Sequence, residues 1–249
     1  MDATRFTVLT ALALAAGTTA AQSLTVVNQP WPGESTHAQM LAEAFGGSFS
    51  SMGQVTGVNA KAGQSNLVDI GYTNGSYTFT RVADMGGSAG NVSLKNLMGG
   101  GDDDMWRDGS YRATSLGGYS SLSHEFGYIG ANGEYHTIVA EGVSALENSI
   151  HPNEDFTWAI RTSNGREYNS NEMLNGSGAD HMVTYAMYDD SNTLIGAVLF
   201  FEDWAGGNSD YDYNDYAVML TLAPTPQAAL LGLLGLGGVA AGRRRRTIA

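Results

Sequence analysis

One stretch of the chain holds most of the side chains that could do chemistry. Between two apolar runs, residues 195–201 and 216–222, lie five carboxylates and two amides with no Lys or Arg among them. These side chains are Glu202, Asp203, Asn208, Asp210, Asp212, Asn214 and Asp215. Carboxylates crowded this closely raise one another's pKa unless a cation lies between them. Oxygen ligands on a loop that also contains Gly206 and Gly207 are what a hard cation such as calcium requires.

Asp210, Asp212 and Asn214 fall at every second position of this stretch. Side chains alternate between the two sides of an extended backbone, so these three would point the same way. Tyr211 and Tyr213 would then point the other way, into a core or against a neighbouring strand. The predicted calcium ligands are Glu202, Asp203, Asp210, Asp212, Asn214 and Asp215, with Asp180 as an additional candidate outside the loop.

The loop is not an EF-hand, although its first half is similar to one. Counting from Asp210, the sixth position, where an EF-hand needs Gly, is Asp215. The position of the bidentate Glu is taken by Thr221. The alternative that involves no metal is a solvated acidic hairpin tip, whose charges discourage pairing between sheet edges.

A second acidic cluster lies in residues 99–109, GGGDDDMWRDG. Its carboxylates are Asp102, Asp103, Asp104 and Asp108, and Trp106 is the expected anchor to the core. Three consecutive carboxylates cannot all face one ion, so a charged loop is expected here rather than a metal site.

Three familiar catalytic motifs are missing from the sequence: HExxH, GxGxxG and the phosphate-binding loop. His124 and Glu125 are adjacent, and adjacent side chains of a strand face opposite sides, so they are not expected to act as an acid–base pair. His37, at the start of a predicted helix, is not expected to be a ligand. We therefore expect a protein that is not an enzyme.

Composition narrows the class of protein. The chain has 249 residues, a formal net charge of −13, 33 Gly, 12 Tyr and no Cys. Such an acidic surface argues against nucleic acid as a partner and favours divalent cations. Without disulfides, an exported domain must be held together by its core or by bound metal.

The abundance of Gly, Ser, Thr, Asn and Tyr predicts a mainly β protein, an antiparallel β-sandwich of jelly-roll type. One short N-terminal helix is the exception: Ser35 or Thr36 can cap it, it runs to Phe45, and Gly46 ends it. Turns are expected at Asn164–Gly165 and at Asn192. Strands are expected at 24–27, 66–72, 76–84, 118–129, 133–143, 155–161, 182–189, 195–201 and 216–222.

Both ends of the chain carry targeting features. Residues 1–22 have the pattern of a secretory signal peptide, with Arg5 before an apolar run and small residues at 19–21. The other end combines a Pro-Thr-Pro breaker, a Gly-rich apolar run at 227–242 and four arginines, which predicts a short transmembrane sorting helix. The predicted division is a signal peptide at 1–22, an N-terminal β-rich region at 23–150, a C-terminal β region at 151–223 that continues the same sandwich, and a sorting tail at 224–249.

The tail resembles the PEP-CTERM sorting signal, with Pro224-Thr225-Pro226 in place of Pro-Glu-Pro. Residues 156–222 are similar to a domain of unknown function that is common in that group. The similarity lies in the strand ending Phe-Glu-Asp at 201–203, the loop at 210–215 and the Gly-Ala-Asp-His stretch at 178–181. The resemblance implies export, processing by exosortase and transfer to the cell surface or the extracellular polysaccharide matrix. It implies no activity.

The expected function is that of an exported structural or binding protein of the cell surface or extracellular matrix, with calcium in its acidic loop. Its expected partners are the exosortase-type machinery and extracellular polysaccharide, and it would meet the membrane only through the tail before processing. One alternative is a carbohydrate-binding module whose tryptophans, Trp31, Trp106 and Trp204, lie coplanar along one sheet face. The other is a glycan-active hydrolase, which needs two acids about 5–10 Å apart across a cleft.

Overall fold

The computed structural model describes residues 24–57, 67–83, 93–94, 97, 103–107, 109–141, 144–146, 154–176, 178–205 and 209–222. Within these ranges the protein is mainly β, with antiparallel sheets and one α-helix, as predicted. The predicted signal peptide and sorting tail lie outside the described residues. In the part that is described, no helix has the length and apolar character needed to span a membrane.

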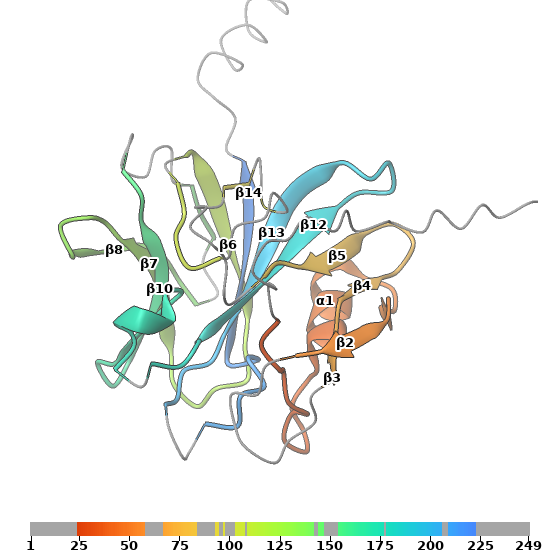
Figure 1. Cartoon of the computed structure of the whole chain (residues 1–249), viewed down its shortest axis with the longest axis horizontal. Helices are drawn as coiled ribbons and strands as arrows, with labels where there is room; N and C mark the ends of the chain where they lie inside the picture. The colour runs from red at the N-terminus through yellow and green to blue at the C-terminus, as the bar shows by residue number, and fades with distance from the viewer. Residues whose placement is uncertain are drawn as a thin grey trace, which may run out of the picture.

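Most of the strands belong to two sheets (Figure 1). The larger sheet has eight strands in the order β1 (Ser50–Ser51), β4 (Gly71–Thr73), β5 (Thr78–Arg81), β12 (Met182–Tyr188), β13 (Leu194–Phe201), β14 (Tyr216–Leu222), β6 (Tyr111–Gly117) and β9 (Ser144–Leu146). The smaller has four, in the order β11 (Glu167–Asn169), β10 (Thr157–Thr162), β7 (His124–Ile129) and β8 (Tyr135–Ala140). A separate pair joins β2 (Gln54–Thr56) to β3 (Leu67–Asp69). The eight-stranded sheet therefore contains strands from both predicted β regions.

The middle of the larger sheet is buried on both faces. In β13, Leu199 and Phe201 belong to one core, which the four-stranded sheet also fills, while Val198 and Phe200 belong to a second core on the opposite face. The helix α1 (His37–Phe45) covers that opposite face, and the four-stranded sheet lies on the other side (Figure 1). Full burial of such a side chain contributes about 1.5–3 kcal/mol. A strand buried on both faces reads as a continuous apolar run, which is why residues 195–201 and 216–222 were recognisable in the sequence.

Capping interactions determine where α1 begins and ends. The hydroxyl of Thr36 accepts a hydrogen bond from the Gln39 N–H at 3.3 Å, and the Gln39 side chain accepts one from the Thr36 N–H at 2.8 Å. This capping box satisfies two of the donors that a helix start leaves open. Gly46, with φ of 77°, ends the helix, because a residue with a side chain rarely adopts that conformation. The predicted helix is confirmed.

Several elements differ from the sequence prediction. Residues 24–27 form no named strand, although Thr25 and Val26 are buried. The expected strand at 66–72 is divided into β3 and β4, because the chain bends at Ile70 before Gly71, whose φ is 154°. Strand β6 was not predicted, since Tyr111–Gly117 mixes small, polar and charged residues. The hairpin turns at Asn164–Gly165 and Asn192 are confirmed.

Candidate metal centre

The acidic loop connects β13 to β14, but its backbone is not extended as the sequence prediction assumed. Tyr211 and Tyr213 have φ values of 58° and 57°, in the left-handed region that residues with side chains rarely adopt. Both tyrosines are nevertheless buried, with 6% and 0% of their surface exposed. The prediction that they point inward is confirmed, and its geometric reason is wrong: alternating left-handed residues turn them inward, not an extended chain.

Tertiary contacts hold this unusual backbone in place. The Tyr213 hydroxyl donates to the Asp180 carbonyl at 3.1 Å, and the Tyr211 N–H donates to Glu202 Oε2 at 2.9 Å. On the other side, the Asn28 N–H donates to the Tyr211 carbonyl at 2.9 Å. A left-handed residue costs of order 1–3 kcal/mol and persists only where the surroundings determine it. The loop is therefore a constrained structure that fixes the positions of its carboxylates.

The predicted ligands separate into two groups. The inner group is Glu202, Asp203 and Asp215, and the outer group is Asp210 and Asp212 together with Glu34. Within each group, one carboxylate oxygen from every member lies within 4.8 Å of the others. Among the described residues, no Lys or Arg forms an ion pair with either group. Six carboxylates are thus held in two tight sets, and the basic side chain that the described residues place against them is His124, next to Asp203.

Several carboxylate oxygens of the inner group already accept hydrogen bonds from backbone N–H groups. Glu202 Oε1 accepts from the Trp204 N–H at 3.1 Å, and Asp215 Oδ2 accepts from the Asp203 N–H at 2.8 Å. Burial, and then the nearby charge of Asp215, raises the pKa of Glu202 to about 10. Burial and the charge of Asp203 raise the pKa of Asp215 to about 8. In the absence of a cation, protons therefore remain on this group at neutral pH.

Asp203 is the member of the inner group that stays ionised. Burial opposes its charge, but hydrogen bonds from His124 and Ser120 outweigh that effect and hold the pKa of Asp203 below its ordinary value. His124 Nε2 lies 2.8 Å from Asp203 Oδ2, and its ring stacks on Tyr216 with centroids 5.0 Å apart. Glu125, next to His124, points to the exposed side of β7, so the expected separation of this pair is confirmed.

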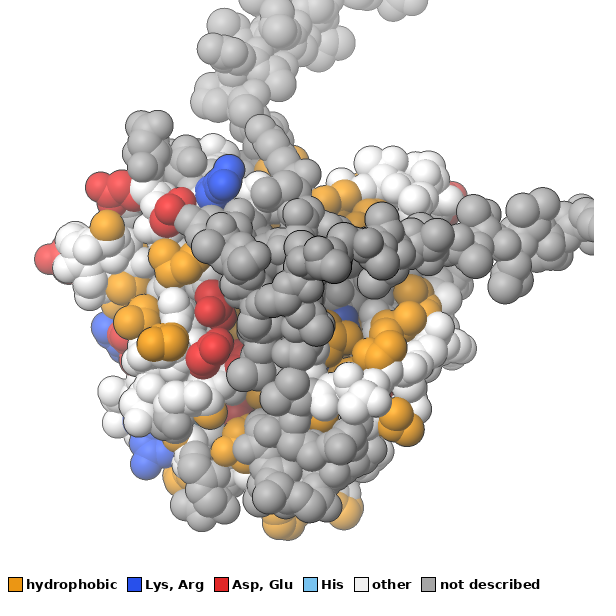
Figure 2. All heavy atoms as spheres, viewed as in Figure 1, with side chains coloured by type: hydrophobic (Ala, Val, Ile, Leu, Met, Phe, Trp, Pro, Cys, Tyr) orange, Lys and Arg blue, Asp and Glu red, His pale blue; other side chains and the backbone are white. Residues whose placement is uncertain are grey.

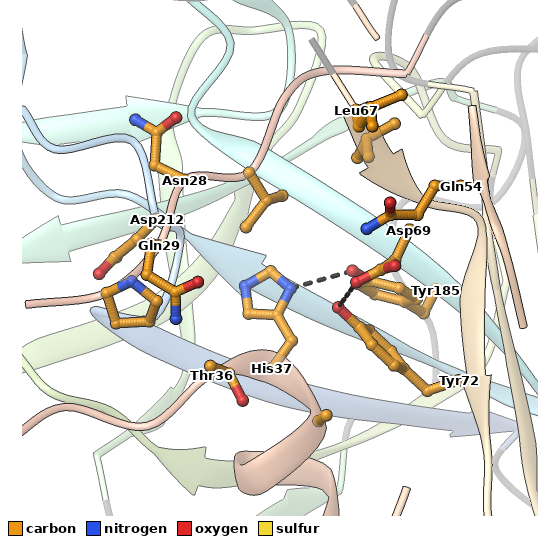
Figure 3. Close-up of a pocket in the computed structure, with 14 residues that line it drawn as sticks. Asn28, Gln29, Thr36, His37, Gln54, Leu67, Asp69, Tyr72, Tyr185 and Asp212 are labelled. Atoms are coloured by element: carbon orange, nitrogen blue, oxygen red, sulfur yellow. Dashed lines mark hydrogen bonds between the residues drawn. The ribbon is translucent and has the colours of Figure 1, made fainter. Parts of the chain in front are cut away.

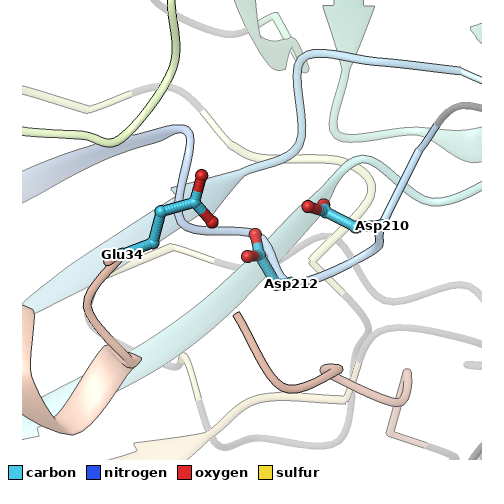
Figure 4. Close-up of side chains that lie close together, drawn as sticks. All are labelled: Glu34, Asp210 and Asp212. Carbon is cyan, nitrogen blue, oxygen red and sulfur yellow. The ribbon is translucent and has the colours of Figure 1, made fainter. Parts of the chain in front are cut away.

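The outer group joins two distant parts of the chain (Figure 4). Glu34 comes from the segment just before α1, and Asp210 and Asp212 come from the loop before β14. Asp212 is only 1% exposed, and its Oδ1 accepts from the Asn214 N–H at 3.1 Å. Among the described residues its buried Oδ2 has no hydrogen-bond donor, and the Glu34 carboxyl is close enough to share a proton with Asp212. A buried acceptor left without a donor costs about 1–3 kcal/mol, and more when it is charged.

In the outer group, the pKa of Asp212 is also raised above its ordinary value. Burial, only partly offset by the Asn214 N–H, raises the pKa of Asp212 to about 7, and the charges of Asp210 and Glu34 add to the rise. Glu34 and Asp210 are partly exposed, so water can reach the group from one side. An ion bound here could complete its coordination with water, as calcium with its six to eight oxygen ligands commonly does.

The remaining predicted ligands lie outside both carboxylate groups. The Asn214 side-chain amide donates to the Ser35 carbonyl at 3.2 Å. Asp180 accepts from the Thr25 hydroxyl at 2.9 Å and from the Met182 N–H at 3.0 Å, so it braces the backbone rather than facing the groups. Glu34 was missed by the sequence analysis. No neighbouring residue in the sequence identifies Glu34 as a ligand, because its position beside Asp212 depends on how α1 packs against the sheet.

The described carboxylates of the second acidic cluster belong to neither group. Asp102 and Asp108 lie outside the described residues, and Asp103 and Asp104 are in neither group. Trp106 is fully buried and pairs with Phe156 through its backbone, so its predicted role as an anchor is confirmed. On the face that Figure 2 shows, the described surface carries scattered acidic side chains and only isolated basic ones.

In chemical terms, the two groups offer oxygen ligands alone, which suits a hard cation better than a soft one. Comparison of the chain with protein-family models, curated proteins and solved structures found no match. The functional argument therefore depends on the geometry of the site.

Proposed function

We propose that this protein is an exported, non-enzymatic binding module of the cell surface or extracellular matrix, stabilised by calcium in its acidic loop. One observation carries the proposal: no donor among the described residues reaches the buried Oδ2 of Asp212, and the Asp212 carboxylate lies in a group with those of Glu34 and Asp210. A divalent cation would satisfy that oxygen and remove the repulsion among the three charges.

The outer group is the preferred calcium position in this proposal. Glu34 and Asp210 are partly exposed and so accessible to water, and no donor in the described part of the chain occupies Asp212 Oδ2. In the inner group, by contrast, both oxygens of Glu202 accept backbone N–H groups, and His124 and Ser120 occupy Asp203. The inner group would bind a second ion more weakly or keep its protons.

The proposed location rests on the two ends of the chain. An N-terminal secretory pattern and a tail that resembles PEP-CTERM signals support export, processing by an exosortase-type enzyme and association with extracellular polysaccharide. Intact mass spectrometry of the protein from its native host tests this. Expected are a start near Gln22 or Ser23 and an end near residues 224–226; a surface protein that retains Arg243–Arg246 would contradict the sorting proposal.

For the fold, we propose the jelly-roll-like form of the sandwich. Its support is that the chain passes repeatedly between the two sheets, from β6 to β7, from β8 to β9 and from β11 to β12. Such crossings suit a closed sandwich better than two independent sheets. An experimentally determined structure would test this connectivity.

Calcium binding itself is testable with terbium, which binds calcium sites and emits when a nearby tyrosine or tryptophan transfers energy to it. Terbium emission that calcium displaces is expected for the parent protein. In Asp212→Asn it should fall at least tenfold, because a neutral amide replaces the key carboxylate. Asp190→Asn is the matched control, since Asp190 is exposed at the turn between β12 and β13. Equal emission from all three proteins would contradict the outer-group site.

The positions of the three tryptophans do not support a carbohydrate-binding module that uses them as its binding surface. Trp31 is 63% exposed, whereas Trp106 is completely buried in the core between the sheets. Trp204 lies beneath the Arg166 guanidinium, 4.5 Å from it. Because these side chains do not share one exposed sheet face, they cannot form the expected binding platform. A different feature of the structure points to carbohydrate.

A further inference from the structure

A cavity of about 580 Å³ lies beside the acidic loop, on the helix-covered side of the larger sheet (Figure 3). This volume is within the roughly 300–1,000 Å³ typical of small-molecule sites. The segment before α1, the start of α1, strands β2, β3 and β4, and Asp212 together line it. The cavity is therefore built by elements from both ends of the described chain.

Its polar side chains come from two opposing walls. Asn28, Gln29 and Asp212 lie on one wall, and Gln54 and Asp69 lie on the other (Figure 3). Gln29 and Gln54 are exposed, and neither side-chain amide has a hydrogen-bond partner among the described residues. An amide offers two donors and one acceptor in a plane, so each can bind a group that both donates and accepts.

Apolar side chains complete the lining. Val27, Pro30, Ala38, Leu67 and Val68 all face the cavity. Leu67 leaves 54% of its surface exposed, so it offers apolar surface to an occupant of the cavity. The mixture of apolar surface with a few converging polar groups is characteristic of ligand sites.

The floor of the cavity consists of His37 and Tyr185, two polar side chains that hydrogen-bond to each other. His37 Nε2 lies 3.1 Å from the Tyr213 carbonyl, which can only accept, so Nε2 carries the proton and Nδ1 accepts from the Tyr185 hydroxyl at 3.0 Å. His37 therefore has no free nitrogen to serve as a catalytic base here, which favours binding over hydrolysis.

Charge further limits the occupant. Among the described side chains that line the cavity there is no Lys or Arg, whereas Asp69 and Asp212 are present, so these residues would repel an anion. Under the floor, the Arg81 guanidinium lies 5.4 Å from the centre of the Tyr185 ring and offsets part of the negative charge. Asp69 already accepts hydrogen bonds from Tyr72 at 3.0 Å and Ser51 at 2.6 Å. A cation would have to compete with both.

We propose that this cavity binds one neutral sugar unit of a polysaccharide. Sugar hydroxyls both donate and accept, which matches the Gln29 and Gln54 amides and the Asp69 carboxylate. The C–H faces of a sugar ring match the apolar surface of Leu67 and Val68. The inference deepens the proposed function, and it shares Asp212 with the outer group, so a calcium ion there would fix one wall of the cavity.

Saturation-transfer NMR tests the proposal on the purified protein. The probes are glucose, galactose, mannose and N-acetylglucosamine, with glucuronic acid as the anionic probe and glucosamine as the cationic one. Transfer to at least one neutral sugar is expected, and weaker transfer to the charged probes. Gln54→Ala should weaken that sugar's affinity about 3- to 10-fold, the effect of losing one or two hydrogen bonds. Asp190→Asn should leave it unchanged.

Gln54 is exposed, so its variant should melt with the parent, and a loss of binding can then be attributed to the cavity. Transfer to no neutral sugar, preference for a charged probe, or equal affinity in Gln54→Ala would each overturn the proposal. The saturation-transfer measurement is repeated with a chelator present. Sugar binding that persists there and still depends on Gln54 would support the cavity even if the calcium proposal failed.

Discussion

Glu34 and Asp212 approach each other from opposite ends of the folded chain, with carboxylate oxygens within 4.8 Å. Glu34 lies two residues before Thr36, the N-cap of α1, and Asp212 lies in the loop that leads into β14. Two acids brought together by long-range packing repel each other unless a proton or a cation lies between them. An ion at this point would link the helix-bearing segment to the sheet.

Replacing Glu34 tests that link. Glu34→Gln should lower calcium affinity about tenfold or more, because it removes one of three charged ligands. In chelator the variant should be as stable as the parent or slightly more stable, since it relieves repulsion within the outer group. Calorimetric titration and urea unfolding measure the two effects, with Asp190→Asn as control. A variant that loses stability in chelator yet binds calcium normally would show that Glu34 is structural.

The stability of the metal-free protein should fall as pH rises. Folding raises the pKa of Glu202 to about 10, of Asp215 to about 8 and of Asp212 to about 7, so the folded state keeps protons that the unfolded chain releases near pH 4. The stability that these protons contribute is complete below about pH 4 and is lost as pH rises towards those values. The lowered pKa of Asp203 acts in the opposite direction and matters only at acidic pH.

Calcium should reverse this loss by taking the place of the protons. In chelator, the free energy of unfolding should decrease between about pH 5 and about pH 8, by about 1.4 kcal/mol per pH unit for each proton that the folded state retains. With saturating calcium the decrease should be smaller. Urea unfolding across this range measures both slopes. A metal-free protein that grows more stable over the range would contradict the assigned proton binding.

Tyr213 tests whether the loop is a constrained structure or a loose tip. The side chain is fully buried, and its hydroxyl donates to the Asp180 carbonyl. Tyr213→Ala should leave a cavity and cost about 2–4 kcal/mol, whereas Tyr213→Phe should cost only about 0.5–1.5 kcal/mol for the hydrogen bond. Leu174→Ala, at a 61% exposed site, is the control. Identical denaturation midpoints for Tyr213→Ala and the parent would favour a solvated tip.

The sequence was most informative where local chemistry decides the structure. The helix at 37–45 has its capping residues within one turn, and β14 was predicted with its observed bounds, 216–222, because residues on both its faces are buried and the run is apolar except for Thr221. Strand β6 escaped prediction because its position between β14 and β9 depends on pairing partners far along the chain.

The candidate site, too, was predictable where residue type alone is informative and was not predictable where tertiary packing decides the structure. The sequence located the acidic loop and the inward tyrosines, since carboxylates and aromatics are conspicuous by type. It could not show that two left-handed residues divide the acids into an inner and an outer group. Nor could it show that Glu34 joins the outer group, because that contact arises from tertiary packing alone.

Thermal unfolding with calcium and with chelator tests the central claim most directly. A ligand that binds only the folded state at about 100 times its Kd adds about 2.7 kcal/mol, which for a domain of this size raises Tm by about 5–10 °C. Millimolar calcium should produce this rise, magnesium should produce less, and Asp212→Ala should abolish most of it. Superimposable melting curves with calcium and with chelator would contradict a calcium site in the acidic loop.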